Sequence, residues 1–332
     1  MIELRRFNLI GNSLAFARVK DQIEKLSRVD ATVLITGESG TGKELAARAV
    51  HYLGQRNDHP FAPVNCGALA DSLLESELFG HERGAFTDAR TASAGLVGNA
   101  DGGTLFLDEV DTLSPKAQAA LLRFLQDRTY RRVGGGTTRQ VNVRILAACN
   151  GDLESMSRSK LFRRDLLYRL NVLSLEMPPL RERGNDAIEL AEILLERFSR
   201  QYNLPRKRIS TKGINFIKQY DWPGNVRELE NLVHREFLMS EDNELDFSGT
   251  CSSTVSAPLE MPSATASNLN FRDAKVLAIA KFEVDYVREI ITRADGNLSA
   301  AARIAGTDRS AFGKLARKHG FGGNIGQRKH AG

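Results

Sequence analysis

Residues 37–44, Gly-Glu-Ser-Gly-Thr-Gly-Lys-Glu, have the types and the spacing to bind a phosphate chain. Gly37, Gly42 and Lys43 satisfy the pattern G-x-x-x-x-G-K. In such a loop, backbone N–H groups surround phosphate oxygens at the start of a helix, and the lysine neutralises the β and γ phosphates. A glycine turn at the surface is the alternative. The residues expected to bind nucleotide are Gly37, Glu38, Ser39, Gly40, Thr41, Gly42, Lys43 and Glu44.

A second set of polar residues follows two apolar stretches that read as strands. Residues 102–110 contain Asp108 and Glu109 after the apolar run, and residues 141–150 end in Asn150. Asp108 is expected to hold Mg²⁺, directly or through water, and Glu109 to polarise the attacking water. Asn150 would lie at the carboxyl edge of a sheet, where open α/β folds bind ligands. An ordinary asparagine at a strand end is the alternative for Asn150.

An α/β fold is needed to position these residues. Residues 31–50 run from a β-branched strand through the glycine-rich turn into a helix. Residues 186–198 have apolar side chains on one helical face, at Ala187, Leu190, Ala191, Leu194 and Phe198. The Trp-Pro-Gly turn at 222–224 precedes another helix, so we expect a helical lid after the α/β core.

A change in composition indicates where the large part of the chain ends. From 247 to 270, Ser, Thr, Ala and Pro dominate and Glu260 is the only charged residue, which is typical of a flexible linker. We therefore expect an α/β ATPase core at 1–180, a helical lid at 181–246, the linker at 247–270 and a small C-terminal domain at 271–332.

Composition also excludes several classes of protein. The 332 residues are 42% apolar and 26% charged, which is ordinary for a globular chain. No apolar stretch is long enough to span a bilayer, and the N-terminus lacks the apolar core of a signal peptide. We therefore expect a cytoplasmic protein with no membrane partner. The three cysteines have neither metal-ligand nor redox spacing.

The C-terminal residues 297–332 carry seven basic residues and one acid, Asp308, although the net charge of the whole chain is only +5. Residues 298–305 and the segment after Gly306 have the spacing of a helix-turn-helix, with Thr307 or Asp308 as the cap of the second helix. We expect the second helix to contact double-stranded DNA. A helical hairpin without DNA contact, or a solvated basic tail, is the alternative. The expected DNA-binding residues are Arg309, Ser310, Lys314, Arg317 and Lys318.

Six motifs, in order, carry a resemblance to a known family: GESGTGKE, ELFGHERGAFTDA, GGTLFLDE, FRRDLLYRLNV, PPLRER and WPGNVRELEN. Together they resemble the AAA+ domain of bacterial sigma-54-dependent transcription activators, also called enhancer-binding proteins, from about Leu9 to Leu245. The resemblance implies an α/β AAA+ P-loop ATPase core with a parallel sheet between helices, an all-helical lid, and a C-terminal Fis-type helix-turn-helix domain. It also explains Glu44, because the family's phosphate loop usually carries Glu where other P-loops carry Ser or Thr.

The resemblance further implies roles for residues that spacing alone does not explain. ATP would lie between neighbouring subunits of a ring, usually a hexamer, with Arg163 and Arg169 as fingers that reach the neighbour's γ-phosphate. Arg227 matches the second sensor, an arginine that reads nucleotide state from the lid. Asn65 matches the switch asparagine that holds the catalytic Glu109. Structural or surface ion pairs are the alternative for the three arginines.

Residues 84–89 resemble the Gly-Ala-Phe-Thr-Gly-Ala loop with which these activators press on sigma-54. The implied contact residues are Gly84, Ala85, Phe86, Thr87, Asp88 and Ala89. Asp88 replaces the second glycine and adds a Cβ and a negative charge at the tip. Aspartate tolerates turn conformations, so the loop geometry can survive, whereas contact with an acidic partner surface would weaken. Residues 127–138, with Arg128, Arg131 and Arg132, resemble the second, shorter loop that assists the first, and a hairpin turn with solvated arginines is the alternative.

The sequence thus predicts an ATP-hydrolysing activator that binds upstream enhancer DNA and remodels the closed complex of sigma-54 RNA polymerase to open promoters. One alternative is a DNA-binding regulator of the same ancestry that no longer engages sigma-54, for which Asp88 is the evidence. Another is a different P-loop ATPase, such as a helicase loader or a small-molecule kinase. Because the ATPase motifs begin near residue 1, we expect no receiver domain and control by a regulator in trans. The stand-alone phage-shock and type III secretion activators are similar in this respect.

Overall fold

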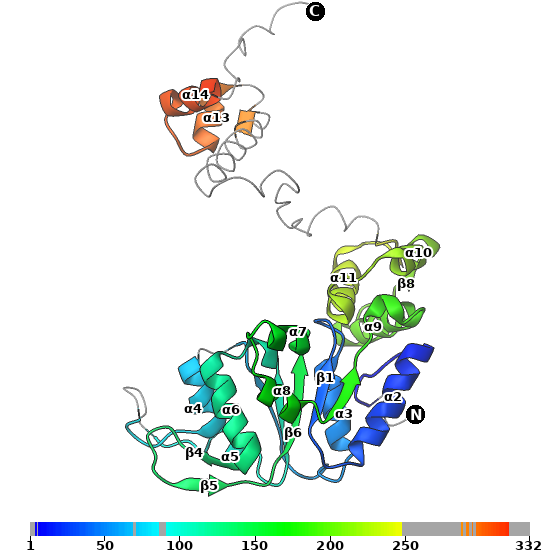
Figure 1. Ribbon diagram of the computed structural model, residues 1–332. Coiled ribbons are helices and arrows are strands. Elements are labelled where there is room, and N and C mark those ends of the chain that lie inside the picture. Colours follow the sequence, from blue (N-terminus) through cyan, green and yellow to red (C-terminus); the bar gives the residue numbers. More distant parts are fainter. Residues whose placement is uncertain are drawn as a thin grey trace, which may run out of the picture. The chain divides into compact units, whose positions relative to one another are not determined.

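The computed structural model describes residues 4, 6–68, 71–85, 91–247, 287, 290–291, 294 and 297–318. The chain divides into two units, Met1–Ser252 and Ser253–Gly332, and each is described by itself. The first unit contains an α/β core and a lid, and the second contains a helical pair (Figure 1). Among the described residues, every helix is too short or too polar to cross a membrane.

A five-stranded parallel sheet forms the centre of the α/β core, with strand order β2-β3-β6-β1-β7. Its strands are β1 (Val33–Thr36), β2 (Phe61–Asn65), β3 (Thr104–Asp108), β6 (Arg144–Cys149) and β7 (Leu173–Glu176). In the register, Asn65 is opposite Asp108 and Thr36 is opposite Cys149. The polar segments that follow these strands therefore emerge at one edge of the sheet, which is where ligands bind in open α/β folds.

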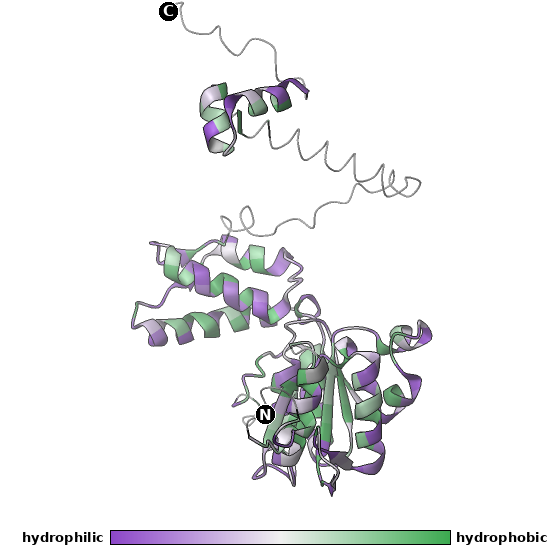
Figure 2. Cartoon of the chain, turned by 90° about the vertical axis from the view of Figure 1, so that its left-hand side faces the viewer, coloured by the Kyte–Doolittle hydropathy of each residue, from purple (hydrophilic) through white to green (hydrophobic). Residues whose placement is uncertain are grey.

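Helices cover both faces of this sheet, which confirms the predicted fold class. On one face, α2 (Leu14–Ser27) and α3 (Lys43–Tyr52) pack on Val33 and Ile35. On the other face, Leu34 contacts the core formed by the remaining helices, because successive strand residues point to opposite faces. These helices are α4 (Asp71–Phe79), α5 (Gly95–Asn99), α6 (Pro115–Asp127), α7 (Leu153–Arg158) and α8 (Arg164–Leu170). Figure 2 shows mainly hydrophobic strands between helices that carry both hydrophilic and hydrophobic stretches.

Three shorter features connect the core elements. The antiparallel hairpin of β4 (Thr129–Arg131) and β5 (Thr138–Gln140) follows α6. Single 3₁₀ turns follow β3 and β7, namely η1 (Val110–Thr112) and η2 (Leu180–Glu182). The turn after β7 leads directly into the lid.

The lid consists of α9 (Asp186–Tyr202), α10 (Thr211–Gln219), α11 (Asn225–Met239) and the short strand pair β8 (Arg208–Ile209) and β9 (Glu244–Leu245). The predicted apolar face of α9 is confirmed, because all five of its predicted residues are buried. They pack with Trp222, whose indole N–H donates to the carbonyl of Ile217 at 3.0 Å. Phe247, which the sequence assigned to the linker, is only 1% exposed in the same core. The lid extends to this residue because burial stabilises a large aromatic ring.

The described part of the second unit contains α13 (Leu298–Ile304) and α14 (Arg309–Lys318). Gly306 turns the chain with a φ of 65°, and the Asp308 carboxylate accepts two backbone N–H bonds from the first turn of α14. Asp308 is therefore the cap of this helix. Phe312 and Ala316 of α14 are buried with two alanines of α13, which lets the helices approach closely.

The α/β core also contains a buried histidine whose titration should affect stability. His51 of α3 is 1% exposed, and its Nδ1 lies 2.8 Å from the Thr104 hydroxyl. Burial lowers the pKa of His51 to about 4, from an ordinary value of 6.5. Below pH 6.5 this histidine is protonated in the unfolded chain, whereas in the folded chain it stays neutral down to about pH 4. Stability therefore falls as the pH decreases through this window.

We expect His51 to contribute a loss of about 2 kcal/mol in the free energy of unfolding between pH 7.5 and pH 5. Urea unfolding of the wild type and of His51→Gln at both pH values measures this contribution. The variant should lose less stability than the wild type over the same interval. An equal loss in both proteins would assign the pH dependence to other groups.

Candidate nucleotide-binding and hydrolysis site

The loop between β1 and α3 has the backbone shape of a phosphate cradle. Gly37, Gly40 and Gly42 have φ values of 147°, 76° and 96°, a region that favours glycine. A Cβ on Gly40 would lie 2.3 Å from the carbonyl oxygen of Gly224, so only glycine fits there. Gly42 precedes α3 and offers no side chain to cap it. The first N–H groups of α3 are thus suited to phosphate oxygens.

Lys43 joins this loop to the end of β6. Its Nζ donates to the carbonyls of Gly37 and Glu38 at 2.8 and 2.9 Å and to Oδ1 of Asn150 at 2.6 Å. Burial lowers the pKa of Lys43, while the charge of Asp108 opposes this shift. The structure therefore brings together the predicted lysine and the predicted asparagine, which are 107 residues apart in the chain.

The predicted acids lie at the end of β3, beside this lysine. Asp108 is half-buried, and burial raises its pKa, while a hydrogen bond from the Glu109 N–H at 2.9 Å and the charge of Lys43 lower it. Glu109 has a φ of 55°, so the backbone turns sharply after the strand. A half-buried carboxylate beside a phosphate cradle suits Mg²⁺, which usually takes one or two carboxylates together with phosphate oxygens. Bound there through Asp108, the ion would neutralise phosphate charge.

Asn65 lies on the strand next to Asp108 but does not hold Glu109. Its Oδ1 accepts the N–H groups of Gly67 and Ala68 at 2.8 and 3.1 Å, and among the described residues no hydrogen bond joins it to Glu109. The contact implied by the family resemblance is therefore not present in this structure, and the Asn65 oxygen accepts from the local turn instead. A Cβ placed on Gly67 would come 2.6 Å from Oε2 of Glu109, so this glycine lies beside the carboxylate.

Asp111 is a residue of this site that the sequence interpretation missed. Its carboxylate accepts the N–H groups of Asn150 and Gly151 at 3.4 and 3.1 Å. It therefore ties the turn after β3 to the end of β6 and helps to orient Asn150. The cluster of three acids in residues 108–111 was the sequence signal that could have identified it.

The two predicted finger arginines lie on the surface around α8. Arg163 precedes the helix and forms a two-pronged ion pair with Asp165 at 3.0 and 2.7 Å, with about half of each side chain exposed. Arg169, in the last turn, is exposed. In the described structure neither arginine contacts Lys43 or Glu109 of its own chain. Their exposure leaves them accessible to a second molecule.

The lid contacts the phosphate loop through several side chains. Arg227, the predicted second sensor, donates from Nη1 to the Ser39 hydroxyl at 3.2 Å. The Glu38 carboxylate forms an ion pair with Arg181 of η2 at 2.6 Å, and thus links the loop to the turn that leads into the lid.

Glu44, by contrast, forms an exposed ion pair with Arg48 one turn along α3 at 2.7 Å.

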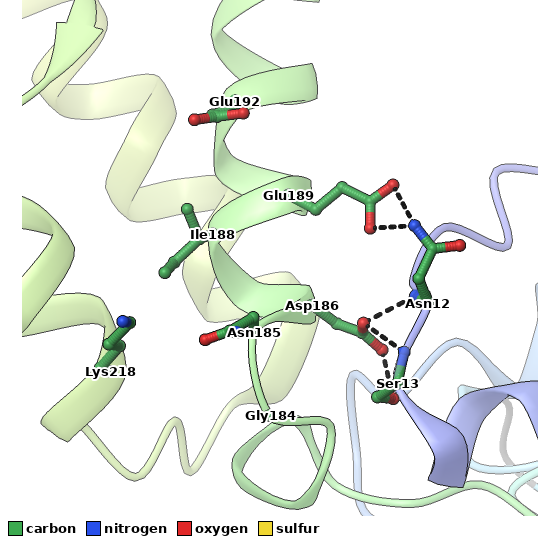
Figure 3. Close-up of a pocket in the computed structure, with 9 residues that line it drawn as sticks. All are labelled: Asn12, Ser13, Gly184, Asn185, Asp186, Ile188, Glu189, Glu192 and Lys218. Atoms are coloured by element: carbon green, nitrogen blue, oxygen red, sulfur yellow. Dashed lines mark hydrogen bonds between the residues drawn. The ribbon is translucent and has the colours of Figure 1, made fainter.

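The N-terminal segment is also bound to the lid, and Figure 3 shows the side chains involved. The Asp186 carboxylate at the start of α9 accepts the N–H of Asn12 at 2.7 Å, and the N–H and hydroxyl of Ser13 at 2.9 and 2.6 Å. Glu189 accepts from the amide of Asn12 at 3.0 and 2.8 Å. These residues line one side of an open pocket of about 630 Å³. The contacts connect the start of the core directly to the lid.

Of the predicted contact loop at residues 84–89, the structure describes the first two residues and the segment that precedes them. His81 pairs with Ser93 and with Val133, and Glu82 forms an ion pair with Arg132 at 3.1 Å. The segment that precedes residue 86 is thus joined to the hairpin of β4 and β5. Gly84 and Ala85 are described, whereas the other predicted contact residues, Phe86, Thr87, Asp88 and Ala89, lie outside the described residues.

Arg128 lies just before the β4–β5 hairpin, whereas Arg131 is part of it. Arg128 ends α6 with a φ of 55°, is half-buried, and donates to the carbonyl of Val143 at 3.2 Å. Burial lowers its pKa. Arg131, by contrast, is exposed on β4 and donates to the Thr138 hydroxyl at 2.8 Å.

The predicted DNA-binding residues share the outer side of α14. All five are exposed, whereas Phe312 and Ala316 of the same helix are buried. They are Arg309, Ser310, Lys314, Arg317 and Lys318. The helix thus presents four cations and one hydroxyl to solvent.

The chain matches two known families within residues 9–261 and several known proteins over more than 90% of its length. Residues 9–176 match the Sigma-54 interaction domain and residues 181–261 match the AAA+ ATPase lid domain. The chain is 44% identical over 314 residues to the nitrogen fixation protein AnfA of Azotobacter vinelandii, covering 95% of this chain and 58% of AnfA. It is 41% identical over 313 residues to the transcriptional regulatory protein ZraR of Salmonella typhimurium, covering 94% of this chain and 69% of ZraR. It spans about half the length of several other curated relatives, such as 45% of the Nif-specific regulatory protein of A. vinelandii.

The solved structures of NtrX from Brucella abortus are similar in fold. One of them aligns with a TM-score of 0.70 and 32% identity, and covers 96% of this chain and 70% of NtrX. NtrX has also been solved in complex with ADP and with ATP, each with a TM-score of 0.69 to this chain. The family match covers half of the chain, and ZraR is matched over more than two thirds of its length. The chain therefore belongs to the sigma-54 interaction domain family of AAA+ P-loop proteins.

Proposed function

We propose that this protein is an ATP-hydrolysing transcription activator that remodels sigma-54 RNA polymerase. The observation that carries the proposal is the meeting of Lys43, Asn150, Asp108 and Glu109 at one edge of the sheet, in a chain of this family. The ADP and ATP complexes of NtrX support ATP as the occupant of the loop. In this proposal Glu109 orients and deprotonates the attacking water, and Asp108 carries Mg²⁺.

The loop at 84–89 is the proposed coupling device. The segment that precedes it is paired with the turn of the β4–β5 hairpin through His81 and Val133, and Glu82 and Arg132 form an ion pair there. The two loops can therefore move together when nucleotide state changes. Phe86 and Thr87 are the proposed contact residues on sigma-54, and they convert this movement into opening of the promoter complex.

Two further contacts complete the proposal. The exposed cations of α14 support binding to upstream double-stranded DNA, because a basic helix after a tight turn suits the major groove. The exposure of Arg163 and Arg169 supports a ring of identical subunits, up to a hexamer, in which each ATP lies between two neighbours. A dimer would match a palindromic DNA site.

One alternative function is favoured by a specific residue. Asp88 replaces a glycine of the family loop and adds negative charge at the tip. A DNA-binding regulator that no longer engages sigma-54 would keep the ATPase site and the helix-turn-helix domain while losing this contact. The activator and this regulator would both hydrolyse ATP and bind DNA, but only the activator would open the promoter.

The test is open-complex formation on a sigma-54 promoter with purified protein, sigma-54 polymerase and ATP. We expect the wild type to open the promoter, and Thr87→Ala to hydrolyse ATP at a near-normal rate while opening at least tenfold less. Asp88→Gly is the companion variant, which restores the family residue. If the wild type hydrolyses ATP without opening the promoter and Asp88→Gly gains this activity, the regulator that has lost sigma-54 is the correct assignment.

A further inference from the structure

Four consecutive residues of the phosphate loop, 38–41, are hydrogen-bonded to the lid and to the turn that leads into it. At the first of them, the Glu38 carboxylate accepts from both terminal nitrogens of Arg181, at 2.6 and 2.9 Å. At the second, the Ser39 carbonyl accepts from Nδ2 of Asn225 at 3.0 Å. Nδ2 of Asn225 also donates to Glu38 at 3.1 Å, so one amide group bonds two adjacent loop residues.

The next two loop residues are bound in the same way. The Gly40 carbonyl accepts from the N–H of Val226 at 3.0 Å. The Thr41 carbonyl accepts from Nη2 of Arg183 at 2.8 Å, and this guanidinium is only 2% exposed. The lid therefore contacts the main chain of the very segment whose N–H groups face the phosphates.

Asn225 is the central residue of this contact. It is completely buried, and its Oδ1 accepts the N–H of Leu180 at 2.8 Å while its Nδ2 bonds the loop. It has a φ of 51°, a left-handed conformation that asparagine tolerates better than most residues. All of its side-chain hydrogen bonds thus run from the lid to η2 and to the phosphate loop.

The charge of Glu38 has a defined partner in this arrangement. The hydrogen bond from Arg181 lowers the pKa of Glu38 to about 2, so the carboxylate is ionised at any working pH. An unpaired carboxylate in a phosphate loop would repel the phosphates. Its pairing with Arg181 offsets this repulsion and ties the loop to the lid.

We propose that Asn225 is a positioning residue for nucleotide binding, acting through the lid clasp, which we define as Glu38, Arg181 and Asn225. The clasp holds the phosphate loop in its binding shape only while the lid is docked. Because linkage is reciprocal, phosphates in the loop favour the docked lid to the same extent that the docked lid favours phosphates. This inference rests on the proposed ATPase function.

The decisive variant is Asn225→Gly, because glycine keeps the left-handed backbone and removes only the amide side chain. The matched control is Asn203→Gly in the same lid: Asn203 also has a left-handed φ, 52°, but is exposed at the end of α9. Both full-length variants are titrated with a fluorescent ADP analogue and assayed for ATP hydrolysis. We expect Asn225→Gly to raise the Kd for ADP and the KM for ATP about tenfold, equal to about 1.4 kcal/mol, with kcat within twofold. Asn203→Gly should match the wild type.

The split between KM and kcat separates positioning from a general loss of structure. If Asn225→Gly matches Asn203→Gly in Kd and KM while the wild type binds ADP and hydrolyses ATP, the clasp is wrong and the proposed function stands. If the wild type does neither, both fail. If Asn225→Gly does not fold, ADP binding is measured instead for Glu38→Gln, for Arg181→Met and for the double variant. We then expect the double variant to bind ADP no more weakly than the worse single variant; additive losses would overturn the proposal.

Discussion

Replacing Glu109 with glutamine is expected to lower the rate of ATP hydrolysis about 10²- to 10⁴-fold while leaving ATP binding within a few-fold of the wild type. The amide has nearly the same shape as the carboxylate but cannot accept a proton from water. The left-handed backbone at Glu109, with a φ of 55°, is no more strained with glutamine, so the loss is chemical rather than conformational. Phosphate release measures hydrolysis, and a fluorescent ATP analogue measures binding.

Glu154→Gln provides the control for this experiment. Glu154 is an exposed residue of α7 in the same core, and the substitution makes the same chemical change. It should hydrolyse ATP at the wild-type rate. Near-normal turnover in Glu109→Gln would remove Glu109 from the role of general base. Weakened ATP binding would show instead that Glu109 contributes to binding ATP before the reaction.

Replacing Arg169 with alanine is expected to lower ATP hydrolysis about 10³- to 10⁵-fold, the range that arginine fingers contribute elsewhere. A guanidinium supplied to the transferred phosphoryl group stabilises charge that develops in the transition state. Arg163→Ala should act in the same direction. The ion pair of Arg163 with Asp165 is about half exposed and therefore contributes little to stability, so the arginine can leave it for a phosphate.

Mixing inactive subunits tests whether the finger acts on a neighbour. Lys43→Ala has a defective loop with intact fingers, whereas Arg169→Ala has an intact loop with a defective finger. In rings mixed one to one, about a quarter of the interfaces combine an intact loop with an intact finger, so mixing should restore a measurable part of the wild-type rate. Rings that contain only one of the two variants should stay inactive. No recovery in rings shown to contain both variants would place Arg169 outside the neighbour's site.

The candidate site residues of the α/β core are largely predictable from the sequence, because their signals are local. The phosphate loop requires glycines at fixed positions before a helix, and the two acids must follow an apolar strand. The apolar spacing of α9 and the cap of α14 depend in the same way on neighbours within two turns of a helix. The parallel sheet, by contrast, was expected from the resemblance to the family, and the structure confirms it.

Contacts between distant segments were decided only by the tertiary structure. Asn225 and Glu38 are 187 residues apart, and Asp111 is 39 residues from Asn150, so no local pattern predicts either hydrogen bond. The sequence also does not show that Arg128, at the end of α6, donates to the carbonyl of Val143. These contacts depend on which elements the sheet order brings together, and that order is set by packing across the whole core. The sequence by itself therefore determined which groups are the candidates for nucleotide binding and hydrolysis, and the folded lid and sheet decided which residues hold them in place.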